Sequence, residues 1–200
     1  MKRIFIIISI LLILGGFSVS AELVVINSLE TDPVSVNILD SEPEYTIMEI
    51  TLNNYYLDTI EIDKDEYFHL YLPGGGHLLE KGNPELPTKS SSLMIPAKAK
   101  MKVEIISSTY TEMYGQIAPS KGSLSRSVNP DDIPYEFSNV YKEDEFYPED
   151  IVSLSDPYIL REIRGITFRI VPFTFNPVQS TIRVYEIYYY QSLFWRIWLC

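Results

Sequence analysis

The side chains best suited to nucleophilic chemistry in this sequence are one cysteine, Cys200, and two histidines, His69 and His77. A nucleophilic cysteine needs an imidazole beside it as a base, so these residues are the natural candidates for a catalytic dyad. Cys200 is the last residue of the chain, however, where few neighbours can hold a thiolate in position. We therefore expect no catalytic residue in this chain and no enzyme activity of its own.

The same histidines are candidate metal ligands, but they lie eight residues apart and no third ligand is spaced with them. Asp63, Asp65 and Glu66 are similar to the start of a calcium-binding loop, yet the glycine and the closing glutamate of such a loop are missing. The sequence therefore predicts a solvated acidic turn at Asp63–Glu66, no metal site and no cofactor.

The composition excludes nucleic acid as a partner. The chain of 200 residues has a formal net charge of -11, and phosphate binding requires clustered lysine and arginine instead. A single cysteine also excludes an intramolecular disulfide.

The N-terminus has the three parts of a secretory signal peptide: the basic pair Lys2-Arg3, an apolar stretch over Ile4–Leu14, and the small residues Val19-Ser20-Ala21. We expect residues 1–21 to be removed by cleavage between Ala21 and Glu22, which would leave no stable membrane span. The protein would then be secreted, periplasmic or on the cell surface. An uncleaved N-terminal anchor is the alternative.

The remainder of the chain is predicted to be all-β. Segments rich in β-branched and aromatic residues alternate with proline and glycine, which is typical of an antiparallel β-sandwich or barrel-like domain. The expected strands are Tyr45–Leu52, Tyr67–Leu72, Met101–Ile106, Gly165–Phe175 and Thr181–Tyr190. No amphipathic helix longer than two turns is expected.

Between these strands, the segment from Tyr114 to Asp150 lacks a clear period and predicts a long loop. Its aromatic residues favour an ordered excursion with an exposed tip near Ser120–Ser127. A single helical turn is expected at Asp156–Arg164.

Proline and glycine motifs follow one another in a fixed order along about half of the chain. They are Gly82-x-Pro84-x-Leu86-Pro87, Leu93-x-Ile95-Pro96, Ala118-Pro119-Ser120-Lys121-Gly122, Asn129-Pro130, Ile133-Pro134-Tyr135, Tyr147-Pro148, Arg164-Gly165, Pro172-Phe173, Asn176-Pro177 and Ile182-Arg183-Val184-Tyr185. In this order and spacing they resemble the N-terminal propeptide of gingipain-type cysteine peptidases. The resemblance implies that residues 22–190 form one gingipain-type propeptide β-domain.

The resemblance also implies a partner, the catalytic domain of a gingipain-like cysteine endopeptidase, which the propeptide inhibits and helps to fold. Because such enzymes cleave after Arg or Lys, it implies a basic residue presented to the specificity pocket from the loop before Asn129-Pro130. Arg126 lies in that loop, and Lys121 is the second candidate. A guanidinium can pair bidentately with a buried carboxylate. The alternative is that Arg126 is an ordinary solvated loop charge.

The last ten residues, 191–200, contain both tryptophans and the cysteine of the chain. This abrupt change in composition favours an aberrant or truncated tail, as a frameshift would produce, and a native hydrophobic terminal strand is the alternative. The second function class that the sequence leaves open is a standalone exported β-domain for surface adhesion or assembly.

Overall fold

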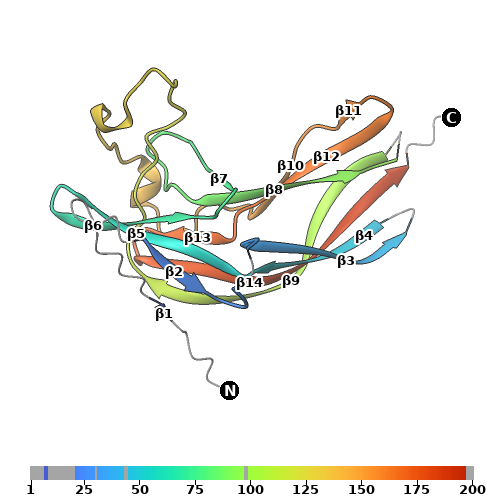
Figure 1. Cartoon of the computed structure of the whole chain (residues 1–200), viewed down its shortest axis with the longest axis horizontal. Helices are drawn as coiled ribbons and strands as arrows, with labels where there is room; N and C mark the ends of the chain where they lie inside the picture. Colours follow the sequence, from blue (N-terminus) through green and yellow to red (C-terminus); the bar gives the residue numbers. More distant parts are fainter. Residues whose placement is uncertain (1–6, 9–20, 30, 43–44, 97–98, 197–200) are drawn as a thin grey trace.

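The computed structural model describes residues 7–8, 21–29, 31–42, 45–96 and 99–196. Within these ranges the chain forms strands and two short 3-10 helices, and no α-helix. The predicted all-β class is therefore confirmed. The strands belong to three antiparallel sheets that make two layers (Figure 1).

The first layer is built on two long neighbouring strands, β9 (Ala99–Tyr114) and β14 (Thr181–Arg196), which pair along their full lengths. The other edge of β14 pairs first with β13 (Phe173–Asn176) and then with β4 (Tyr45–Leu52), and β3 (Val34–Glu42) follows β4. This sheet is the lower layer in Figure 1.

The second layer contains the other two sheets. One has the order β1 (Ile7–Ile8), β2 (Glu22–Val25), β5 (Asn54–Ile62) and β6 (Asp65–Tyr71). The other has the order β10 (Val152–Leu154), β12 (Ile163–Ile170), β8 (Pro87–Met94) and β7 (Gly76–His77), with β11 (Tyr158–Leu160) also paired to β12.

The core lies between the two layers, because the strands bury alternate residues. Along β4, even-numbered positions are buried and odd-numbered ones are half-exposed, so that Ile50 and Leu52 have no exposed surface. Tyr55 of β5 packs edge-on against Phe173 of β13 at 5.0 Å between ring centroids, which joins the two layers. On β14 alternate residues are buried in the same way, at Ile182, Val184, Glu186 and Tyr188.

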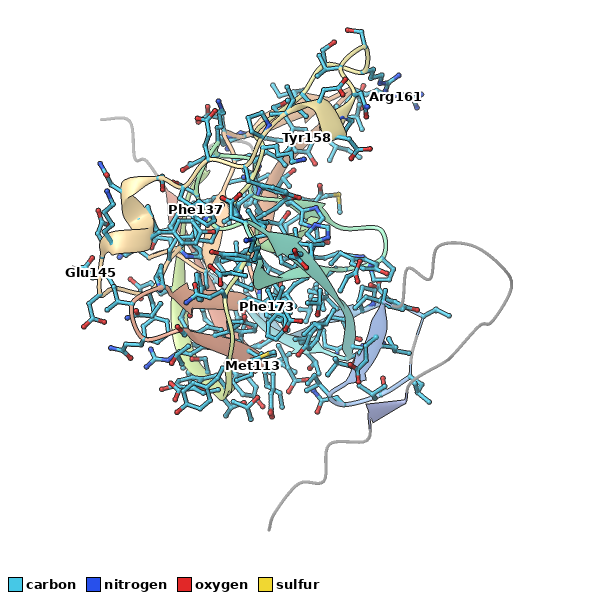
Figure 2. The ribbon with its side chains drawn as sticks, turned by 90° about the vertical axis from the view of Figure 1, so that its left-hand side faces the viewer. Met113, Phe137, Glu145, Tyr158, Arg161 and Phe173 are labelled. Carbon is cyan, nitrogen blue, oxygen red and sulfur yellow. The ribbon has the colours of Figure 1, made fainter. Side chains whose placement is uncertain are left out.

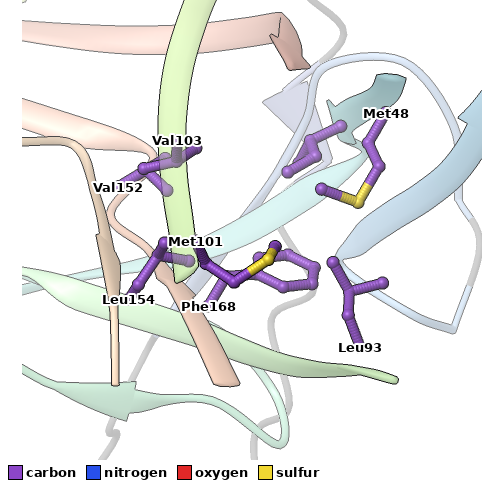
Figure 3. Close-up of a pocket in the computed structure, with 8 residues that line it drawn as sticks. Met48, Leu93, Met101, Val103, Val152, Leu154 and Phe168 are labelled. Carbon is purple, nitrogen blue, oxygen red and sulfur yellow. The ribbon is translucent and has the colours of Figure 1, made fainter. Parts of the chain in front are cut away.

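A small apolar gap separates the layers where β4 and β9 face β10 and β12 (Figure 3). It has a volume of about 10 Å³ and is lined by Met48, Ile50, Leu93, Met101, Val103, Val152, Leu154 and Phe168. That volume is at the lower limit for one water molecule, and the lining offers no polar partner. The gap is thus a packing defect of the core and not a ligand site.

Residues 115–150 leave the sheets and return as one ordered excursion, drawn in yellow in Figure 1. It contains the two 3-10 helices, η1 (Pro130–Asp132) and η2 (Asn139–Lys142). Tyr141 of η2 donates a hydrogen bond to the carbonyl oxygen of Ile117 at 2.8 Å. The predicted ordered loop is therefore found, with an aromatic residue holding it to the domain.

Three local expectations were wrong. The strand predicted over Gly165–Phe175 is two strands in different layers, because the chain turns at Pro172, whose nitrogen cannot donate to a ladder. Asp156–Arg164 contains β11 and a hairpin turn where a helical turn was expected. Ser120, placed in an exposed tip, is only 1% exposed, since the exposed part of the loop begins a few residues later.

The structure describes part of the chain at each end of the predicted domain. Ala21 precedes β2, which begins at Glu22, whereas most of the predicted signal peptide lies outside the described residues. At the other end, the backbone of residues 191–196 continues β14 beside β9, and the origin of the last ten residues stays a prediction. Among the described residues, no helix is long and apolar enough to cross a membrane.

Candidate functional site

The loop that carries the predicted basic residues is closed at its base by Lys121. The Nζ atom of Lys121 donates to the carbonyl oxygen of Pro130 at 2.8 Å and lies 4.2 Å from the ring centroid of Tyr135. The ammonium group is thus shared between a backbone acceptor and an aromatic face. Lys121 joins the two ends of a ten-residue loop, 121–130, and its charge is held within the excursion.

Arg126 lies at the far end of this loop, in a turn. The backbone N–H of Val128 donates to the carbonyl oxygen of Ser125 at 3.0 Å, and the hydroxyls of Ser125 and Ser127 are 3.1 Å apart. Arg126 is therefore the second residue of a β-turn, with a hydrogen-bonded serine on each side. Its side chain is exposed, and within the described ranges its guanidinium has no ion-pair or hydrogen-bond partner.

Below the loop, the excursion is fixed to the segment that contains the first glycine-proline motif. Ser120 donates its N–H to Asn83 and accepts from the N–H of Gly82, both at 2.8 Å, while Ser138 donates to the carbonyl of Gly82 at 2.9 Å. Gly82 has a φ of 84°, and a Cβ there would lie 3.2 Å from the Ser138 nitrogen. Only glycine suits this position without strain, because two backbone segments of the excursion approach it.

Aromatic packing fixes the returning half of the excursion. Tyr141 contacts Phe137 edge-on at 4.8 Å and Phe175 at 6.2 Å between centroids, and Figure 2 shows Phe137 beside the 3-10 helix η2. Burial, with smaller contributions from nearby tyrosines and Glu85, raises the pKa of Tyr141 well above its ordinary value. The hydroxyl therefore remains protonated at neutral pH and can donate to Ile117.

A second exposed arginine lies on the other projection of the same side of the molecule, the β11–β12 hairpin (Figures 1 and 2). Leu160 pairs with Ile163, so Arg161 and Glu162 form a two-residue turn, and Arg161 has a φ of 57°. The hairpin is unusually apolar, since Ile159 is 75% exposed and Leu160 is 66% exposed. Sequence reasoning missed this surface because the segment was expected to be helical.

Comparison with known proteins gives the family. A family profile described as Propeptide_C25 matches residues 27–191. The chain belongs to this propeptide family. Because the match is to the propeptide and not to a catalytic domain, the propeptide domain is not itself the enzyme.

The relatives are gingipains of Porphyromonas gingivalis. The propeptide domain is 38% identical to gingipain R2 over 151 residues, which are 75% of this chain and 20% of that protein. It is 34% identical to gingipain R1 over 175 residues, 86% of this chain and 17% of that protein. The chain thus spans about a fifth of the length of the curated relatives it matches.

Two solved structures are similar to the propeptide domain. A complex of the pro- and mature domains of RgpB from P. gingivalis superposes with a TM-score of 0.75 at 36% identity, covering 80% of this chain and 84% of that chain. A structure concerning the zymogenic latency of gingipain K from the same organism gives a TM-score of 0.70 at 17% identity, covering 86% and 98%. The second likeness shows the shared fold alone.

A third group of chemically active side chains lies where β6, β7 and the segment before β8 meet. His69, His77 and Glu85 come together so that one ligand atom from each lies within 4.8 Å of the others. The sequence argument found no third ligand for the histidines, and the structure supplies Glu85. Its position between Pro84 and Leu86 follows no metal-binding spacing, so the sequence offered no signal for this cluster.

Proposed function

We propose that this domain inhibits a gingipain-like cysteine endopeptidase by covering its active site, with Arg126 in the specificity pocket. The observation that carries the proposal is the exposed guanidinium of Arg126 on a turn whose loop is closed at its base by Lys121. A peptidase that cleaves after arginine needs an acidic group in its pocket, and a guanidinium pairs with a carboxylate through two parallel hydrogen bonds.

The two basic residues of the loop have different roles in this proposal. The Lys121 ammonium is committed to Pro130 and the Tyr135 ring, so moving it into a pocket would break the contact that closes the loop. Arg126 gives up no such contact. It is therefore the residue that enters the pocket, and Lys121 maintains the loop that presents it.

The bracing of the loop supports inhibition. A loop already held in one conformation loses little conformational entropy when it binds, so more of the contact energy appears as affinity. A complex between pro- and mature domains has been solved for the RgpB relative, which is similar in sequence as well as in fold. A folding-aid role rests on the same family membership and is tested by the yield of active catalytic domain refolded with and without the propeptide domain.

The decisive experiment measures the inhibition constant against an Arg-specific gingipain-type peptidase for wild type, Arg126→Ala and Arg161→Ala. We expect Arg126→Ala to weaken inhibition by about 2 kcal/mol or more, roughly thirtyfold, as loss of a central anchor does. Arg161→Ala is the matched control, an exposed arginine on another turn, and should change the constant less than about fivefold.

Three outcomes contradict parts of this proposal. An unchanged constant for a folded Arg126→Ala protein removes the pocket role of Arg126. Equal losses in both variants indicate general electrostatic attraction in place of a specific pocket. Failure of the folded wild-type domain to inhibit any such peptidase favours the standalone adhesion or assembly function.

We also propose that the chain is exported and cut between Ala21 and Glu22, as the N-terminal sequence predicts. N-terminal sequencing of the exported protein should then begin at Glu22. Recovery of intact Met1 in the membrane fraction would support an anchor instead.

A further inference from the structure

The side chains of His69, His77 and Glu85 come together from three separate segments of the chain. His69 is on β6, His77 is on the two-residue strand β7, and Glu85 lies just before β8. All three side chains are partly buried, and their ligand atoms lie within 4.8 Å of one another. Two imidazoles and one carboxylate are thus held at the same point on the rim of two sheets.

The free ring nitrogens of both histidines face the same carboxylate oxygen. The Nε2 atom of His77 is 3.1 Å from the carbonyl oxygen of Leu70, which can only accept, so this nitrogen carries the hydrogen in the neutral ring. That leaves Nδ1 of His77 free, 4.0 Å from Oε1 of Glu85, while Nε2 of His69 is 3.6 Å from that oxygen. Donation of the second ring N–H to a backbone carbonyl is the usual arrangement of a metal-binding histidine.

The separations are too long for direct hydrogen bonds and suit ligands around an ion. Hydrogen bonds of this kind are about 2.7–3.2 Å long. Ligand atoms bound at about 2.0–2.1 Å in a tetrahedral zinc site lie roughly 3.3 Å from each other. The cluster therefore has to contract by no more than about 1.5 Å, which small side-chain rotations achieve. The two rings are already stacked side by side, with centroids 5.4 Å apart and an interplanar angle of 17°.

The backbone that carries the three ligands is firmly held. The N–H of Glu85 donates to the carbonyl of Ala118 at 2.9 Å, and that of Leu78 donates to the carbonyl of Leu86 at the same distance. His77 pairs with Pro87, and His69 lies in the ladder of β6 with β5. A frame of this kind keeps ligands near their binding geometry before an ion arrives.

We propose that His69, His77 and Glu85 bind one divalent transition-metal ion, and the donor set favours Zn²⁺. Two imidazoles with one carboxylate form a zinc site of three protein ligands with an open fourth position. Ca²⁺ and Mg²⁺ prefer sites made of oxygen ligands, so two imidazole nitrogens select against them. The site is independent of Arg126 and of whether the domain inhibits a peptidase.

The test titrates the metal-free, untagged protein with ZnCl₂ by isothermal calorimetry. Every protein carries Cys200→Ser, because a free thiol is itself a zinc ligand. We compare the parent with Glu85→Gln, His69→Asn and a control, Glu149→Gln, in which an exposed carboxylate outside the cluster is removed. Co²⁺ replaces Zn²⁺ in a parallel titration, because its visible spectrum distinguishes four-coordinate from six-coordinate sites.

We expect one ion per chain for the parent and the control. Each ligand variant should bind at least about tenfold more weakly, since losing even an outer-shell partner costs 10–100-fold. At about a hundredfold excess over Kd, Zn²⁺ should raise the Tm of the parent by about 5–10 °C.

Either of two results overturns the proposal. One is the absence of saturable Zn²⁺ binding by the folded parent protein. The other is stoichiometric binding with an affinity that both ligand variants retain. If Glu85→Gln does not fold when metal-free, as judged by circular dichroism, His69→Asn decides the question alone, because His69 is the most exposed of the three ligands.

Discussion

The 115–150 excursion and the β11–β12 hairpin project from the same side of the domain, and each carries an exposed arginine on a turn (Figure 1). They are held in different ways. The excursion has few ladder contacts and depends on individual bonds, such as Lys121 to Pro130 and Tyr141 to Ile117. The hairpin has a regular strand register and exposes apolar side chains, Ile159 and Leu160 among them.

This difference shows how one domain can offer a partner two kinds of surface. Side-chain bonds to backbone allow an irregular loop to keep one conformation while its tip remains polar and accessible. A hairpin with a two-residue turn is ordered by its strand pairing, so its outward side chains can be of any type. Large exposed apolar side chains commonly mark contact surfaces. Arg126 is thus suited to a polar pocket, whereas Arg161 lies beside exposed apolar side chains.

The largest difference in stability between the excursion and the hairpin should come from substituting two glycines, each of which lies beneath an aromatic ring. At Gly115, at the start of the excursion, an added Cβ would lie 2.1 Å from the ring of Phe68. Phe68 cannot move easily, because its N–H and carbonyl bond to Gln116 and Ala118. At Gly165 the Cβ would meet the exposed ring of Tyr158 at 2.7 Å, and that ring can swing away.

We therefore expect Gly115→Ala to lower the free energy of unfolding by about 2–3 kcal/mol and Gly165→Ala by less than about 1 kcal/mol. Urea denaturation of both variants checks this difference. Equal losses would show that the hairpin is held as firmly to the domain as the excursion.

The next largest difference should be in the rates at which trypsin cleaves after Arg126 and after Arg161 in limited proteolysis. Trypsin needs an accessible segment that can open locally. The turn of Arg126 is closed by one backbone hydrogen bond outside any strand ladder, whereas the turn of Arg161 ends a hairpin held by three residue pairs. We expect the bond after Arg126 to be cut at least about tenfold faster, which corresponds to about 1.4 kcal/mol of additional opening at Arg161. Mass spectrometry of early digests gives the order. Earlier cleavage after Arg161 would make the hairpin the more accessible of the two turns.

The smallest difference in stability between the two regions should come from removing one tyrosine hydroxyl from each. Tyr141→Phe leaves the carbonyl of the buried residue Ile117 without its donor and should cost about 1–2 kcal/mol, or about 2–8 °C in Tm. Tyr158→Phe removes a hydroxyl from a ring that is 38% exposed and should cost less than about 0.5 kcal/mol. Differential scanning calorimetry of both variants measures the shifts. A Tm unchanged by Tyr141→Phe would mean that ring packing alone holds η2.

Local patterns were sufficient to predict much of the fold. The strand expected at Tyr45–Leu52 is β4 with the same bounds. The turn between β13 and β14 begins at Asn176-Pro177, a dipeptide typical of turns, and the Asn176 side chain accepts from the N–H of Gln179 at 3.0 Å. These features depend on alternation and on turn chemistry within a few residues, which a single sequence carries.

What the sequence alone determined is therefore the all-β class, the main strands and the loop that bears Arg126. Only the tertiary structure decided which sheet each strand joined, the reversal at Pro172, the burial of Ser120 and the meeting of Glu85 with His69 and His77. The physical reason is the distance in sequence over which these contacts form. Ser120 is buried by its bonds to Gly82 and Asn83, and Glu85 is positioned by Ala118, so each depends on a segment more than thirty residues away that no local pattern encodes.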